Sequence, residues 1–166
     1  CGALQPPPPQ PDLFAVLGLE RSWRVERKDL DRAWRAMSRQ THPDRFAAQG
    51  ALQKRMALQW TATLNEARRV LRDPISRAWY LSTGALRPPE KGGAVLDQDF
   101  LEQIFELQME GQMGEDIAPR AQALLDGVNQ ELDTLFTAWE ADQGSLEAVP
   151  AVLARHKTLH NILHPH

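Results

Sequence analysis

The chain has 166 residues, of which 42% are hydrophobic, and a net charge of −3. These values fit one medium-sized or two small globular domains. The sequence predicts no membrane-spanning helix, because no run of about 18 apolar residues occurs. Only ten residues are glycine, and the commonest residue types, such as Ala, Leu, Arg and Glu, favour helix. Because no useful length of sequence alternates between apolar and polar residues, we predict an all-α fold.

The net charge hides two halves of opposite sign. Residues 12–84 contain 14 Lys and Arg against 8 Asp and Glu, a balance of +6. Residues 85–166 contain 5 against 14, a balance of −9. We therefore expect two surfaces that bind different partners, although two such halves could also simply attract each other.

The N-terminal part begins with a proline-rich stretch at 1–11, for which we predict an extended, semi-rigid lead-in rather than packed structure. The apolar stretch LFAVLGL at 13–19 predicts a helix of one or two turns that Gly18 can end.

The clearest amphipathic helix is predicted within 25–41, where Leu30, Trp34 and Met37 form an apolar stripe. A second stripe on the same helix is basic, and we call it the basic row; it consists of Lys28, Arg32, Arg35 and Arg39. Pro43 biases the preceding residue away from the helical region, so this helix should stop at about Thr41.

A second long helix is predicted over 51–72, followed by a short one that ends near Gly84. Two long helices joined by a loop of roughly six to nine residues form an antiparallel hairpin. The tripeptide His42-Pro43-Asp44 lies at the start of this loop.

The stretch at 85–96 is punctuated by proline and glycine, and the charge changes sign there. We predict that it links a first domain at 12–84 to a second at 97–166. The second domain has helical patterns at 97–113, 118–141 and 145–163, which predict an antiparallel three-helix bundle.

The first domain resembles the J domain, the module that stimulates ATP hydrolysis by DnaK-type heat-shock chaperones. The resemblance rests on LFAVLGL, on His-Pro-Asp between two amphipathic helices, and on LNEARRVLRDPISRAWYL. It implies a chaperone-binding surface made of His42, Pro43 and Asp44 together with Lys28, Arg32, Arg35 and Arg39. The alternative for the basic row is a solvated helix face.

Physical chemistry agrees with this implied role. Pro43 stiffens the loop and lowers the cost of ordering it on binding. Asp44 offers an exposed carboxylate suited to a bidentate arginine of a partner. The basic row would raise the association rate more than the final affinity.

The whole chain resembles the HscB-type co-chaperones of iron–sulfur cluster assembly. No Gly/Phe-rich stretch and no Cys-x-x-Cys repeats follow Gly84, and an acidic helical segment with FLEQIFEL follows instead. The resemblance implies two partners, a DnaK/HscA-type ATPase chaperone and an IscU-type cluster scaffold protein, and no enzymatic activity of the chain itself. It implies a scaffold-binding surface made of Leu101, Phe105, Glu106, Met109 and Leu159. Apolar residues at helical spacing can equally form the bundle core, and the sequence leaves both readings open.

We predict no cofactor and no bound metal. Cys1, the only cysteine, cannot form an internal disulfide, which fits a reducing compartment. It resembles the last ligand of a Cys-x-x-Cys metal site that some family members have, and one thiolate cannot make a tetrahedral site. An accidental terminal cysteine is the alternative. His156, His160 and His164 share one helix face, but they lack an evident acidic or cysteine partner.

Two other functions compete with the co-chaperone. The arginine-bearing helix could bind nucleic acid, but the sequence pI of about 6.0 argues against it. His42 and Asp44 could act as acid–base groups of an enzyme, but no nucleophile or metal cluster accompanies them. We predict the bacterial cytoplasm, with the mitochondrial matrix as the alternative, and leave a weak homo-oligomer open. The chain begins without Met, so we expect it to be cut from a longer one.

Overall fold

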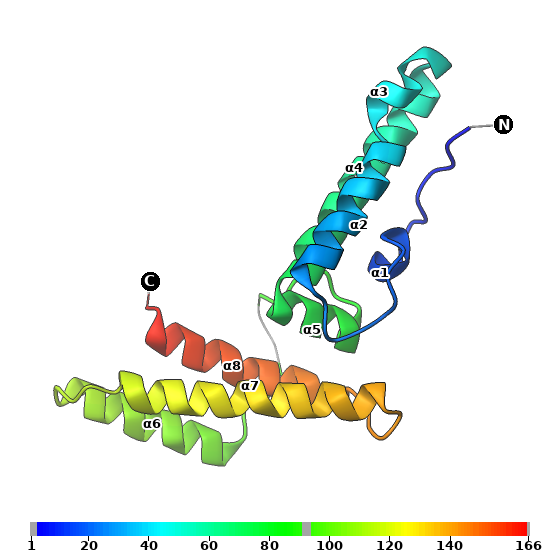
Figure 1. The fold of residues 1–166 in the computed structure, drawn as a ribbon. Coiled ribbons are helices and arrows are strands. Elements are labelled where there is room, and N and C mark those ends of the chain that lie inside the picture. Colours follow the sequence, from blue (N-terminus) through cyan, green and yellow to red (C-terminus); the bar gives the residue numbers. More distant parts are fainter. Residues whose placement is uncertain (1–2, 91–93, 166) are drawn as a thin grey trace. The chain divides into compact units, whose positions relative to one another are not determined.

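The computed structural model describes residues 3–90 and 94–165, and within these ranges all regular structure is helical (Figure 1). Cys1 lies outside the described residues. The chain divides into two compact units, Cys1–Arg77 and Ala78–His166. This division falls inside a helix, upstream of 85–96, so the predicted linker and domain limits stay predictions. No helix in the described ranges is long and apolar enough to cross a membrane.

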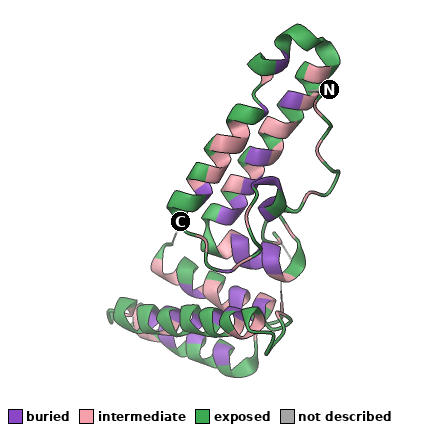
Figure 2. Ribbon diagram, turned by 45° about the vertical axis from the view of Figure 1, so that its right-hand side comes forward, coloured by how far each residue is buried: buried purple, intermediate pink, exposed green. Residues whose placement is uncertain are grey.

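The first unit is built on an antiparallel pair of helices, α2 (Arg27–Gln40) and α4 (Ala51–Arg72). The bounds of α4 are those predicted, and α2 lies within its predicted range. Leu30 of α2 is fully buried, as are Leu64, Ala67 and Leu71 of α4. Figure 2 shows buried positions recurring along the two helices of the hairpin between exposed ones.

A single helical turn, α1 (Leu13–Val16), packs against α4. Asp12 begins it, because one carboxylate oxygen accepts hydrogen bonds from the Phe14 and Ala15 N–H groups at 2.9 and 3.3 Å. Leu13 and Phe14 are buried. Gly18 follows with φ +68°, which permits the turn that ends α1 as predicted.

The described part of the proline-rich stretch, residues 3–11, has no regular secondary structure, and it is tied to α4. The Trp60 Nε1–H donates to the Gln5 carbonyl at 2.6 Å. Gln53 accepts from the Leu4 N–H at 2.6 Å. These polar side chains of α4 therefore hold a segment that we expected to lie free of packed structure.

Helix α5 (Pro74–Thr83) follows directly after α4 and begins with a capped turn. Asp73 Oδ2 accepts from both the N–H and the hydroxyl of Ser76, at 2.9 and 2.8 Å. Arg77 is buried, and its Nη1 donates to the Leu71 carbonyl at 2.6 Å. Its guanidinium lies 5.0 Å from the ring centroid of Trp23, and burial lowers its pKa. Arg77 thus joins the end of α4 to the segment before α2.

After the end of α5, the described part of the second unit contains three helices, α6 (Gln98–Gln112), α7 (Ala118–Glu140) and α8 (Val149–Leu163). They form the predicted antiparallel bundle (Figures 1 and 2). Ion pairs join Arg120 of α7 to Glu110 of α6, and Arg155 of α8 to Glu131 of α7. Pro119 and Pro150 both sit in the first turn of their helices, where the missing N–H costs nothing.

Within 118–141, the spacing of apolar residues predicts a nearly heptad seam made of Leu125, Val128, Leu132, Leu135 and Trp139. The buried side of α7 differs slightly from this seam. Leu125, Val128 and Leu132 are buried as expected. Leu135 and Trp139 are only half-buried, whereas Phe136 is fully buried and packs edge-on against Trp139 with ring centroids 6.2 Å apart. The straight helix turns by 100° per residue, so a strict heptad seam drifts over four turns.

We expect Arg77→Ala to lower the free energy of unfolding by about 1.5–3 kcal/mol, because it leaves the buried Leu71 carbonyl without its charged donor. Urea unfolding followed by circular dichroism measures this change. The matched control is Arg72→Ala on the exposed side of the same segment, which should stay within about 0.5 kcal/mol of the wild type. Equal losses in both variants would contradict the role given to Arg77.

Candidate functional site

Pro43 determines how the chain turns between the two long helices. α2 ends at Gln40, one residue before the predicted end, and Thr41 caps it by donating through its N–H and hydroxyl to the Met37 carbonyl. His42 is extended, with φ −61° and ψ 134°. Pro43 is then the first residue of a new turn, α3 (Pro43–Phe46), which is followed by a 3₁₀ turn, η1 (Ala47–Gln49). The predicted loop is therefore mostly helical.

Contacts with α2 and α4 hold this turn against the hairpin. Phe46 is buried, and α3 packs against α4. The Arg45 guanidinium donates to the Arg39 carbonyl at the end of α2, at 3.4 Å. Gly50 has φ +102°, which lets the chain enter α4. Phe46 is a structural residue of this turn that was not predicted, although an aromatic residue three positions after a proline is a usable signal.

Asp44 projects from this fastened turn into solvent. Its side chain is 93% exposed and that of His42 is 57% exposed. His42 Nδ1 accepts from the Asp44 N–H at 3.2 Å and lies 3.6 Å from the Asp44 carboxylate. Within the described ranges, no member of the basic row pairs with Asp44. The turn therefore offers a carboxylate that the molecule's own arginines leave available.

The basic row is exposed along the whole of α2, at Lys28, Arg32, Arg35 and Arg39. A single contact with a carboxylate is recorded within it, between Arg32 and Asp29 at 3.7 Å. Both side chains of this pair are well exposed, so the pair contributes little to stability. The row is thus a positive face on the helix that leads into the turn.

Helix α6 has two apolar stripes. One is buried in the bundle, at Phe100, Ile104 and Leu107. The other faces solvent and we call it the α6 apolar face; it consists of Leu101, Phe105 and Met109, which are 49%, 62% and 43% exposed. The structure thereby decides a question that the sequence left open, since these three residues are not bundle core.

A shallow cavity of about 460 Å³ lies on this face, lined by Gln98, Leu101, Glu102, Phe105 and Glu106. Glu106 is exposed beside Phe105. Leu159, which we had predicted for the same surface, is fully buried. That prediction is corrected, because the apolar face of α8 on which Leu159 lies is turned into the bundle.

The three histidines of α8 line up along the helix without forming a metal site. The ring centroids of His156 and His160 are 6.1 Å apart, and those of His160 and His164 are 4.6 Å apart. In the described part of the chain, no group of three or more His, Cys, Asp or Glu side chains could hold a metal ion.

Comparison with known proteins gives consistent results. No family model matches the chain. The co-chaperone protein HscB homolog of Bordetella petrii is 47% identical over 70 residues, which cover 42% of this chain and 41% of that protein. The HscB homolog of Paraburkholderia phymatum is 37% identical over 140 residues, covering 81% of this chain and 80% of that protein. The crystal structure of human co-chaperone protein HscB superposes with a TM-score of 0.74 at 26% identity, covering 98% of this chain and 83% of that one.

The fold and the His-Pro-Asp turn together define the class of protein. A helical hairpin with His-Pro-Asp at its turn, followed by an antiparallel three-helix bundle, is the layout of a J-domain co-chaperone with its own C-terminal module. With the identity and coverage just given, the chain belongs to the HscB co-chaperone family. The aligned part spans less than half of the Bordetella petrii relative.

The exposure of the α6 apolar face makes a stability prediction. Phe105→Ala should change the free energy of unfolding by no more than about 0.5 kcal/mol, because the side chain is largely in water already. The neighbouring Ile104→Ala should cost about 2–5 kcal/mol, because it opens a cavity in the bundle core. Chemical unfolding of both variants measures the contrast. A loss for Phe105→Ala as large as for Ile104→Ala would place Phe105 in the core.

Proposed function

We propose that this protein is a non-enzymatic adaptor that stimulates ATP hydrolysis by a DnaK/HscA-type chaperone. The observation that supports it most is the exposed Asp44 carboxylate on a turn that Pro43 and Phe46 hold in place. A rigid turn loses little conformational freedom on binding. The hydrolysis chemistry belongs to the chaperone, and this protein contributes binding free energy.

The basic row supports the same partner. Its exposed positive charges precede the turn on the same helix, so a negatively charged surface would be steered towards Asp44. Asp44 would then meet a cationic group on the chaperone, and a carboxylate–guanidinium contact is among the stronger hydrogen-bonded pairs. On this module, the positive charges of the basic row would therefore provide the long-range attraction, and the negative charge of Asp44 would provide the short-range recognition.

Asp44→Asn should abolish most of the stimulation of chaperone ATP hydrolysis, lowering it about tenfold or more, because the amide cannot form the charged pair. A steady-state ATPase assay with a DnaK-type chaperone measures this. Glu20→Gln, which removes an exposed carboxylate elsewhere in the same unit, is the matched control and should stimulate like the wild type. Unchanged stimulation by Asp44→Asn would refute the proposed function, and loss of helical circular dichroism would make the tripeptide structural.

We propose further that the α6 apolar face and Glu106 hold an IscU-type cluster scaffold protein and so bring it to the chaperone. Three large apolar side chains in solvent at i, i+4 and i+8 form a continuous stripe that the bundle does not use. The shallow cavity beside Phe105 gives a partner's side chain a place to enter. Helix faces of this kind commonly act as anchors in protein interfaces. The cellular location stays a prediction.

Leu101→Ala combined with Phe105→Ala should weaken scaffold binding about tenfold or more, since apolar anchors dominate such interfaces. Isothermal titration calorimetry with a cluster scaffold protein measures the change in Kd. Leu52→Ala combined with Leu58→Ala removes two comparably exposed leucines from α4 and should leave the Kd unchanged. A lowered melting temperature with unaltered affinity would contradict this role for the α6 apolar face.

A further inference from the structure

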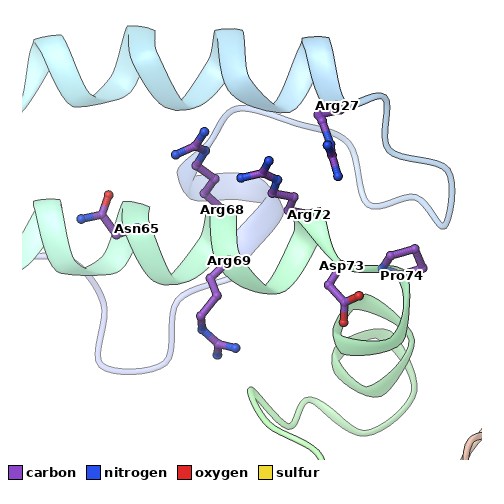
Figure 3. A pocket seen from close by; sticks show the side chains of 7 residues that line it. All are labelled: Arg27, Asn65, Arg68, Arg69, Arg72, Asp73 and Pro74. Carbon is purple, nitrogen blue, oxygen red and sulfur yellow. The ribbon is translucent and has the colours of Figure 1, made fainter. Parts of the chain in front are cut away.

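A second concentration of arginines lies at the end of the hairpin away from the His-Pro-Asp turn. A cavity of about 560 Å³ opens between the start of α2 and the end of α4, and Arg27, Arg68, Arg69 and Arg72 line it. Figure 3 shows Arg27 reaching from α2, and Arg68 and Arg72 reaching from α4, into the space between the two helices. Arg69 and Asp73 point away from that space.

Most of the charged side chains around this cavity already have a partner within the protein. Arg68 pairs with Asp31 at 3.0 Å and lies 4.3 Å from the ring centroid of Trp34. Arg69 forms a bidentate pair with Glu66 at 2.9 and 2.7 Å, which raises its pKa. Asp73 uses its carboxylate to cap α5 through Ser76.

Arg27 and Arg72 are different, because no ion pair or hydrogen bond of either side chain is recorded among the described residues. Both are exposed, and they come from opposite helices of the hairpin. Two guanidinium groups directed into one cavity repel each other until an anion lies between them. Planar guanidinium groups bind carboxylates bidentately, as Arg69 does with Glu66 on the opposite side of α4.

We propose that this cavity is a second docking point for the DnaK-type chaperone, where Arg27 and Arg72 clamp one carboxylate side chain of an acidic segment. The proposal rests on the proposed function and deepens it. Arg27 directly precedes Lys28, so the cavity lies at the N-terminal end of the helix that carries the basic row. A nucleic-acid strand fits less well, because the second half of the chain has a net charge of −9 by the count of 5 basic and 14 acidic residues.

The test measures the Kd of the full chain for the ATP-bound chaperone by fluorescence anisotropy at constant ionic strength. Arg27→Gln combined with Arg72→Gln should weaken binding about tenfold. Each single variant should lose nearly as much as the pair, because both arginines share one acceptor. Arg27→Lys combined with Arg72→Lys keeps the charge but loses the planar fork, and it should not restore the affinity.

The charge-matched control is Arg87→Gln combined with Lys157→Gln, which removes two exposed positive charges elsewhere. If the cavity pair weakens binding no more than this control, or if the lysine pair binds like the wild type, the arginines act only through general charge and the proposal is overturned. Saturation of the cavity by inorganic phosphate, with chaperone affinity unchanged in the glutamine pair, would identify a small-anion site and also overturn it. Asp44→Asn distinguishes failure of the clamp from failure of the proposed function. If Asp44→Asn abolishes stimulation while the cavity variants bind the chaperone like the wild type, only the clamp is refuted.

Discussion

The hairpin depends on the backbone restriction that Pro43 imposes. Proline lacks an N–H and excludes the helical region for the residue before it, so α2 cannot continue past Thr41. The same fixed φ suits the first position of a helix, and the chain starts α3 at once. Burial of Phe46 then fixes the direction in which α3 leaves, and α4 returns along α2. One residue therefore ends α2 and begins α3.

The charged side chains of the first unit fall into two sets: those that pair with each other within the hairpin, and those that remain exposed on its surface. Asp31 of α2 pairs with Arg68 of α4 across the hairpin, and Glu66 pairs with Arg69 along α4. The basic row and Asp44 lie on surfaces that these acidic groups do not reach. Asp44 also stands beyond the C-terminal end of α2, and the His42 imidazole lies 3.6 Å from its carboxylate. The geometry thus keeps an anion and a set of cations on one helix–turn unit without letting them neutralise each other.

The sequence predicted local features well, because helix limits follow from short-range chemistry. Pro43, Pro74 and Gly50 mark breaks that tertiary contacts do not move, and α4 begins and ends where the pattern placed it. The fate of Leu101, Phe105 and Leu159 could not be predicted, since α6 and α8 have more apolar surface than one contact face covers. Which stripe turns inward depends on the packing of the neighbouring helices. The convergence of Arg27 and Arg72 on one cavity likewise depends on how α2 and α4 pack together, which no local pattern encodes.

The groups that we assign to binding are also those on which the fold does not depend. Phe100, Ile104 and Leu107 already supply the core contacts of α6, so its second apolar stripe adds solvent-exposed area that brings no stability to the bundle. The Asp44 side chain likewise makes no buried contact, while its own turn is held by Pro43 and Phe46. Natural sequences depart from local consistency chiefly where function requires it. An unburied apolar stripe and a solvent-exposed carboxylate are two such departures, one in each unit, and this distribution is the one on which the proposal of an adaptor with two separate partners rests.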